Sequence, residues 1–273
     1  MPTQATNSLE RALALLELLE QSPGGLRNAE ICRQLQIPAS TCSYITERLE
    51  QKAYLRRDPE SKRYQIGLKT VALAHGALRD LGVRSIAEPV LYRMAIDTGL
   101  SAGIGVLQQS HVLLVDRVEG PDFVSRVVGN QIAKTNAPKG RTREDRDIGR
   151  ELPVHATALG KVLLAYLPPA ERSELLQGAV LTRSTPKTIT SKARLLAELE
   201  TIRVRGYATA DEEQYPGVRA LGAPIFDSAR RVRAALSLNG NLDEPAWRDP
   251  QVLIERIEEA AANISKRARF IAD

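Results

Sequence analysis

Apolar residues recur at helical spacing three times in the first fifty residues. The pair Asn7-Ser8 is suited to capping a helix, and leucines follow it at positions of one helical face, namely Leu9, Leu13, Leu16 and Leu19. A second helix is predicted over residues 28–35 and a third from Ser40 or Thr41 through Gln51. Residues 54–57 and 63–66 alternate like strands around a turn-forming stretch, 58–62. Three helices followed by a hairpin predict a winged helix-turn-helix.

The third of these helices has an exposed side that is suited to the major groove of DNA, because it carries short polar groups and hydrogen-bond donors. The residues on this side are Ser40, Thr41, Ser43, Tyr44, Glu47 and Arg48. The hairpin, or wing, adds cations suited to phosphate contacts, namely Arg56, Arg57, Lys62 and Arg63. Residues 1–66 hold nine Lys/Arg and eight Asp/Glu, so the prediction depends on where the charges lie. A solvated helix and a solvated hairpin are the alternative.

The rest of the chain alternates between helical and strand-like patterns. Helices are expected over residues 67–82, 83–97, 170–177, 192–205 and 248–267. Strands are expected over residues 101–108, 111–118, 123–128, 207–210, 218–226 and 232–239. Strands with helices between them and at both ends predict an α/β domain of the α+β type with a mainly antiparallel sheet.

The segment from Gly149 to Pro168 predicts the start of a helix whose first turn, residues 155–159, is small and polar. The free N–H groups of such a turn point outward with the positive end of the helix dipole, and a small anion can reach them. A capped core helix that binds nothing is the alternative.

Bulk composition narrows the function classes. The chain has 273 residues, 43% of them hydrophobic and 26% charged, which suits two globular domains. No apolar run reaches membrane-spanning length and no signal peptide is evident, so a cytoplasmic protein without membrane contact is expected. Cys32 and Cys42 are expected to be free thiols. The net charge of +5 permits an acidic partner such as DNA. Three dispersed histidines argue against a metal site, and no cofactor is expected.

Three blocks of the sequence, in order, resemble the IclR family of bacterial transcription regulators. The first includes Ala29-Glu-Ile-Cys-Arg-Gln-Leu and Ile37-Pro-Ala-Ser-Thr. The second is Gly149-Arg-Glu-Leu-Pro-Val-His-Ala-Thr-Ala-Leu-Gly-Lys, and the third runs from Gly206 to Asp227. The resemblance implies a winged helix-turn-helix DNA-binding domain over 1–66, a linker helix over 67–82, and a GAF-like effector-binding and oligomerisation domain over 83–273. It also implies homodimers or homotetramers, a palindromic double-stranded DNA operator and a small-molecule effector.

The resemblance also implies where the effector binds. The contacts carried over are the backbone N–H groups of Ala158 and Leu159, the segment 210–220 with Ala210 and Ala220, and the side chains of Ser237 and Asn239. Family members that respond to glyoxylate or pyruvate have an acidic residue at position 210 and Cys at 220. Alanine at both positions predicts a roomier cavity and a larger organic or aromatic acid. The acidic residues 211–213 are expected to brace the loop rather than contact the ligand.

The sequence departs from the family pattern elsewhere. The recognition helix carries Ala39 and Tyr44 where basic residues are common, and Ala53 follows it where glycine is usual. The long basic stretch 121–150 favours a surface loop, with a second nucleic-acid or oligomer contact as the alternative.

Two other function classes remain open from the residues. An enzyme is conceivable because His155, Thr157 and Lys161 lie close on one segment and Asp211 might join them, but nucleophile-elbow and zinc motifs are absent from the sequence. A metabolite sensor that acts only through protein partners is the other alternative.

Overall fold

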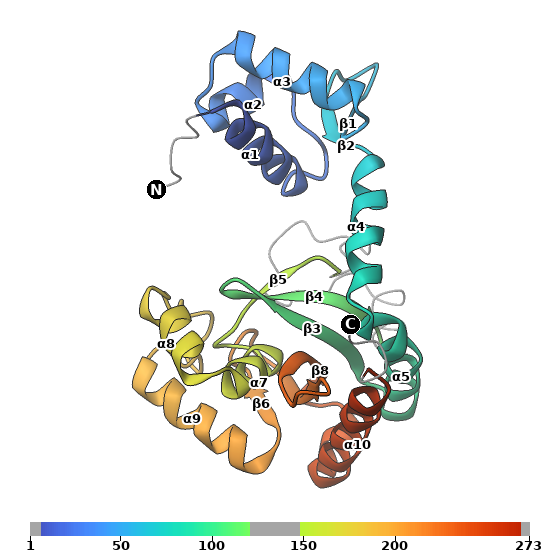
Figure 1. The fold of residues 1–273 in the computed structure, drawn as a ribbon, viewed down its shortest axis with the longest axis vertical. Coiled ribbons are helices and arrows are strands. Elements are labelled where there is room, and N and C mark those ends of the chain that lie inside the picture. The colour runs from blue at the N-terminus through green and yellow to red at the C-terminus, as the bar shows by residue number, and fades with distance from the viewer. Residues whose placement is uncertain (1–6, 121–147, 269–273) are drawn as a thin grey trace. The chain divides into compact units, whose positions relative to one another are not determined.

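The structure is a computed structural model that describes residues 7–120 and 148–268 (Figure 1). The expected strand over 123–128 and most of the basic stretch 121–150 lie outside the described residues. The chain divides into two compact units, Met1–Asp80 and Leu81–Asp273. Among the described residues no helix is long and apolar enough to cross a membrane.

The first unit has the elements that the periodicity predicts. They are α1 (Ser8–Glu20), α2 (Asn28–Leu35), α3 (Ala39–Gln51), β1 (Leu55–Arg57), β2 (Tyr64–Ile66) and α4 (Lys69–Asp80). The side chain of Asn7 accepts a hydrogen bond from the N–H of Glu10 at 2.9 Å, and the Glu10 carboxylate accepts one from the N–H of Asn7, which forms a capping box. The strands β1 and β2 pair antiparallel, with Arg57 opposite Tyr64. The unit is therefore a winged helix-turn-helix followed by a helix.

The buried face of α1 differs from the predicted one. Leu9 and Leu13 are 69% and 51% exposed, whereas Leu15 and Leu19 are buried. The inward face of the helix instead contains Ala12, Leu15 and Leu19, which pack in a core with residues of α2, α3 and the hairpin. Both cysteines are free thiols, and burial raises the pKa of Cys42 to about 12.

The second unit is built on an antiparallel sheet of six strands in the order β5-β4-β3-β8-β7-β6. The strands are β3 (Ser101–Gln108), β4 (His111–Val118), β5 (Glu151–Pro153), β6 (Ala208–Asp211), β7 (Val218–Phe226) and β8 (Val232–Asn241). The helices are α5 (Val83–Thr98), α7 (Ala158–Tyr166), α8 (Pro169–Gln177), α9 (Lys192–Arg205), the short 3-10 helix η1 (Pro245–Arg248) and α10 (Pro250–Ala268).

Helices cover both faces of this sheet. Figure 1 shows α5 and α10 together on one side and α7, α8 and α9 on the other. The helices α5 and α10 pack on each other and on β3 and β7, whereas α7 packs on β7, β8 and α9. A hydrophobic core of the unit lies between α7, α9 and the sheet. The start of α7 therefore lies directly over the centre of the sheet.

The first turn of α7 is placed wrongly by the sequence pattern. Residues 151–153 form strand β5, a turn follows, and the helix begins at Ala158 rather than near His155. Thr157 is the N-cap: its hydroxyl accepts from the N–H of Gly160 at 3.1 Å and donates to the carbonyl of Pro153 at 2.9 Å. His155 is buried before the helix, where its Nε2 lies 3.0 Å from the carbonyl oxygen of Thr182.

Candidate nucleic-acid interface and ligand cavity

The outer face of α3 is polar and open to solvent. Ser40, Ser43, Tyr44 and Arg48 are exposed, and Thr41 is half-buried. The guanidinium of Arg48 lies 5.4 Å from the ring centre of Tyr44, so these two side chains form one stacked pair. The hydroxyl of Ser43 accepts a hydrogen bond from Asn28 Nδ2 at 2.8 Å, which ties α3 to α2. The face thus offers donors and one aromatic–cation pair.

The four cations of the wing fall into two groups. Arg56, Arg57 and Lys62 are exposed, and Arg57 stacks on Tyr64 at 5.4 Å from the ring centre. Arg63 is half-buried and donates to the carbonyl of Gly25 at 2.7 Å and to Glu30 at 3.1 Å. These bonds join the wing to the connection between α1 and α2 and to α2 itself, a bracing role that the sequence pattern did not indicate. Contact of Arg63 with DNA stays a prediction.

The second unit contains a cavity of about 280 Å³ on the α7 side of the sheet. All six residues expected to contact an effector line it: Ala158, Leu159, Ala210, Ala220, Ser237 and Asn239. The strand register explains why residues so far apart in sequence meet. Ala220 lies opposite both Ala210 and Asn239, so these residues form one row across β6, β7 and β8, and Ser237 lies on the same face two residues before Asn239.

The start of α7 forms another wall of the cavity. The N–H groups of Ala158 and Leu159 have no acceptor within the helix, and none is found elsewhere among the described residues. A side chain at Gly222 would place its Cβ 3.0 Å from the carbonyl group of Ala158, so this glycine lets the helix start approach β7. Two backbone donors at the positive end of a helix therefore face a cavity with small side chains around it.

The cavity also holds charged residues that the sequence pattern did not single out. Arg117 pairs with Glu119 at 2.7 Å and donates to Asn239 Oδ1 at 3.3 Å. Arg150 donates a hydrogen bond to the hydroxyl of Tyr215 and lies over its ring. These cations are therefore engaged with protein groups in the cavity wall.

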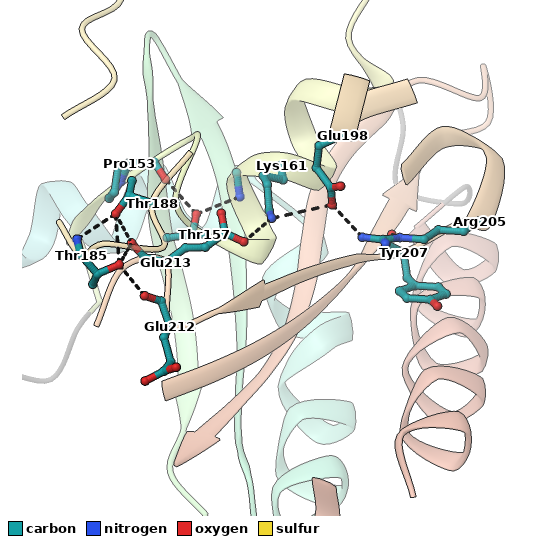
Figure 2. A network of polar contacts seen from close by, with 11 residues as sticks. Pro153, Thr157, Lys161, Thr185, Thr188, Glu198, Arg205, Tyr207, Glu212 and Glu213 are labelled. Atoms are coloured by element: carbon teal, nitrogen blue, oxygen red, sulfur yellow. Dashed lines mark hydrogen bonds and ion pairs between the residues drawn. The ribbon is translucent and has the colours of Figure 1, made fainter. Parts of the chain in front are cut away.

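A buried ion pair lies behind the first turn of α7 (Figure 2). Lys161 is 1% exposed, and its Nζ donates to Glu213 Oε1 at 2.6 Å. The same ammonium group lies 3.8 Å from Glu198, which pairs with Arg205 at 2.9 Å. The four charges cancel, which offsets the desolvation of Lys161. Glu213, expected only to brace its loop, thus holds a buried lysine and also lines the cavity.

The residues considered for catalysis do not form a catalytic set. His155 and Thr157 bond backbone groups, Lys161 is held by Glu213, and Asp211 pairs with Arg219 at 3.3 Å. Within residues 7–120 and 148–268, no group of three His, Cys, Asp or Glu side chains is placed to hold a metal ion.

An exposed recognition helix with a basic wing, in one chain with a cavity under a helix start, defines a ligand-controlled DNA-binding regulator. Comparisons with known proteins agree. Residues 75–266 match the family described as "Bacterial transcriptional regulator IclR C-terminal", and residues 8–59 match the "IclR helix-turn-helix domain". The chain therefore belongs to the IclR family of bacterial transcriptional regulators.

The chain matches individual relatives over most of its length. The HTH-type transcriptional regulator XynR of Escherichia coli is 32% identical over 232 residues, 85% of each protein. The glycerol operon regulatory protein of Streptomyces griseus is 31% identical over 261 residues, 95% of each. The crystal structure of an IclR homologue complexed with 4-hydroxybenzoate, from Microbacterium hydrocarbonoxydans, superimposes with a TM-score of 0.78 at 24% identity, covering 97% of this chain and 100% of that one. The last likeness shows the shared fold.

Proposed function

We propose that this regulator docks α3 in the major groove of an operator and uses its wing on the flanking phosphates. The exposed polar face of α3 supports this docking, with Ser40, Thr41, Ser43, Tyr44 and Arg48 nearest the bases. The exposed cations Arg56, Arg57 and Lys62 would neutralise phosphates. A gel-shift series on the DNA upstream of its own gene and of neighbouring genes tests the proposal. Binding no tighter than to random DNA would contradict it.

The effector in this proposal is an organic or aromatic acid that enters the 280 Å³ cavity. The observation that carries it is the convergence of two unpaired backbone donors with Ser237 and Asn239 around one hollow. Small side chains at Ala210 and Ala220 leave room for a ring, and a relative with the same fold has been solved with 4-hydroxybenzoate. Calorimetry should give tighter binding for hydroxybenzoate-like acids than for glyoxylate, and the reverse order would contradict an aromatic acid.

The regulated unit in this proposal is a homodimer, which can pair further into a tetramer, on a palindromic site. The helix α4 supports it, because apolar residues recur at positions 71, 74 and 78, and Val71 is 61% exposed, as is Leu68 just before the helix at 82%. Leu68→Glu with Val71→Glu should therefore yield monomers in analytical ultracentrifugation. The control Ala77→Glu lies on the opposite side of α4 and should leave the assembly intact. An unchanged mass in the double variant would move the dimer contact elsewhere.

In this proposal the dimer has two states that differ in the placement of its two wings. The ligand binds one state more tightly, and the paired wings then fit the two half-sites of the operator better or worse. The pathway it controls is catabolic in this proposal, and one relative is named for the regulation of a glycerol operon. Neither step requires catalysis by this chain. Incubation of a bound acid followed by mass spectrometry should return the acid unchanged, and turnover would revive the enzyme alternative.

A further inference from the structure

Strand β3 carries two glycines on its face toward α7, Gly103 and Gly105. Glycine weakens a strand, because it loses more conformational freedom on folding than other residues and has no side chain to pack. Inside a strand it usually marks a bulge, a sharp bend, or the close approach of another backbone or of a ligand. The two positions can therefore be compared for what requires a glycine at each.

Packing within the protein explains Gly105. A Cβ at this position would lie 2.6 Å from a side-chain carbon of Val112 and 3.2 Å from one of Leu159 in α7. The pairing of β3 with β4 is also irregular between Ile104 and Gly105. Any larger residue at position 105 would thus push against the neighbouring strand and against α7.

Nothing in the described residues requires a glycine at position 103. A Cβ there would make only ordinary contacts, each at 3.5 Å, with Leu114, Ser237 and the carbonyl oxygen of Asp116. The φ of Gly103 lies outside the left-handed region, and this residue pairs regularly with Arg117 and Ser237. Gly103, Leu114 and Ser237 all line the cavity. The space in front of Gly103 therefore belongs to the cavity, and the close approach of a ligand is the remaining reason for this glycine.

Gly103 lies some distance from the donors at the start of α7. The strand order places β8 between β3 and β7, and Gly103, Ser237 and Gly222 form one row across the three strands. The start of α7 meets the far end of this row, because a Cβ at Gly222 would lie 3.0 Å from the carbonyl group of Ala158. Neighbouring strands are about 4.8 Å apart, so about 10 Å separate Gly222 from Gly103. A two-carbon acid held at α7 ends before Gly103, whereas a ring attached to the carboxylate covers it.

We propose that Gly103 is a specificity-determining residue, whose bare backbone forms the floor of the cavity under the ring of an aromatic acid. The carboxylate of this acid accepts from the N–H groups of Ala158 and Leu159, and its ring lies over Ser237 and Gly103. The inference rests on the effector role proposed above for the cavity. It adds the residue that makes room for the ring, at a position outside the contacts that the family resemblance implies.

The variant Gly103→Ala tests the inference by adding one methyl group to the floor. Calorimetry on the full chain should show benzoate and 4-hydroxybenzoate bound about tenfold more weakly or worse, because one extra carbon in a fitted apolar site has effects of this size. Glyoxylate, which has no ring, should lose no more than twofold. Urea denaturation followed by Trp247 fluorescence should show no loss of stability, since the added Cβ meets no close atom and alanine is favoured over glycine in a strand.

Unchanged stability with a selective loss of ring acids separates a ligand contact from a structural role. Ring acids that bind Gly103→Ala as tightly as the unmodified chain overturn the inference. A less stable variant also overturns it, because the fold itself would then require the glycine. The control Gly178→Ala places a Cβ in open space away from the cavity and should change neither property. Failure of every ring acid to bind the unmodified chain overturns the aromatic effector proposed above as well.

Nuclear magnetic resonance on the unmodified chain gives a second measurement that needs no variant. Ala102-Gly103 is the only Ala–Gly pair in the sequence, so carbon-13 in alanine carbonyls together with nitrogen-15 in glycine selects the amide signal of Gly103. Binding of 4-hydroxybenzoate should shift this signal through the ring current, and glyoxylate should shift it much less. A ring acid that binds and leaves the signal of Gly103 in place overturns the inference, whatever the variant does.

Discussion

The two candidate sites of this chain differ in the chemical groups that they present to a ligand. The face of α3 and the wing present polar and cationic side chains to solvent, with Tyr44, Arg56 and Arg57 all exposed. The cavity presents backbone donors and alanines, and the charged groups in its wall, Arg117, Arg150 and Glu213, are paired with other protein groups. The contrast fits the two ligands proposed, since a polyanion is met by protruding cations and a small acid needs space and a few fixed donors.

The contrast predicts which substitutions change binding and which change folding. Side chains exposed on the first unit should be dispensable for stability, whereas those that shape the cavity support the core as well. The single tryptophan, Trp247, is buried in the second unit, so its fluorescence follows unfolding of that unit alone.

The largest effect is expected from Lys161→Met. The substitution leaves Glu213 buried without its counter-ion, which typically costs about 3–5 kcal/mol. Urea denaturation followed by Trp247 fluorescence should show this loss. The control Lys187→Met removes a lysine whose partner Glu212 lies nearer the surface, and it should cost far less, because solvent screens an exposed ion pair. Equal losses of unfolding free energy in the two variants would contradict a larger contribution from the buried ion pair.

Gly160→Ala should be the next most damaging change. A Cβ at Gly160 would lie 2.3 Å from the carbonyl oxygen of Val154, so α7 or the turn before it must shift. Overpacking of this kind costs about 1–3 kcal/mol. Gly178→Ala is the matched control, because a Cβ there meets no atom within 4 Å. The same fluorescence assay reports both variants, and a Gly160→Ala protein as stable as the control would contradict the tight approach.

The sequence predicted the first unit and most of the sheet because their signals are local. Residues 101–108, 111–118, 192–205 and 218–226 match observed elements end to end. Each of these stretches has enough residues for its period to show. Strand β5 has three residues, too few for any period, and its omission moved the predicted start of α7 forward.

The polar details of the cavity could not be predicted, because they depend on distant pairings. Lys161 and Glu213 are 52 positions apart, and nothing in either local pattern indicates that they meet. The alanines of the cavity wall were predicted only through the family resemblance, because Ala210 and Ala220 have no polar side-chain group that could mark them as binding residues. Arg63 shows the converse limit: its charge predicts a phosphate contact, which stays a prediction. Its hydrogen bonds to Gly25, in the connection between α1 and α2, and to Glu30, in α2, could not be predicted from the local pattern.

Removal of two wing cations tests the prediction that exposed cations of the first unit bind DNA phosphates. Arg56→Ala with Arg57→Ala should weaken operator binding and reduce the slope of log affinity against log salt by about 1.8, because each phosphate contact contributes about 0.9. The control Arg230→Ala with Arg231→Ala removes the same charge from exposed positions of the second unit. Titrations at several salt concentrations measure both slopes. An unchanged slope in the wing variant would favour a sensor that acts through protein partners.

The smallest effect concerns acid stability of the first unit. The N–H of Arg27 donates to Glu30 at 2.7 Å and, with the nearby Arg63 guanidinium, lowers the pKa of Glu30 below its ordinary value of 4.5. A lowered folded-state pKa stabilises the fold above pH 4.5, and this stabilisation is lost as the pH falls through the lower value.

Glu30→Gln should therefore destabilise the first unit slightly at neutral pH and match the unmodified protein in acid, where Glu30 is protonated in both folded and unfolded chains. Amide hydrogen exchange in α2 at a series of pH values measures the difference. The effect is expected to be small because Glu30 lies at the surface, where solvent screens its ion pair with Arg63. A gap between the two proteins that widens as the pH falls would reverse the sign argued here and remove Glu30 from the contacts that brace the wing.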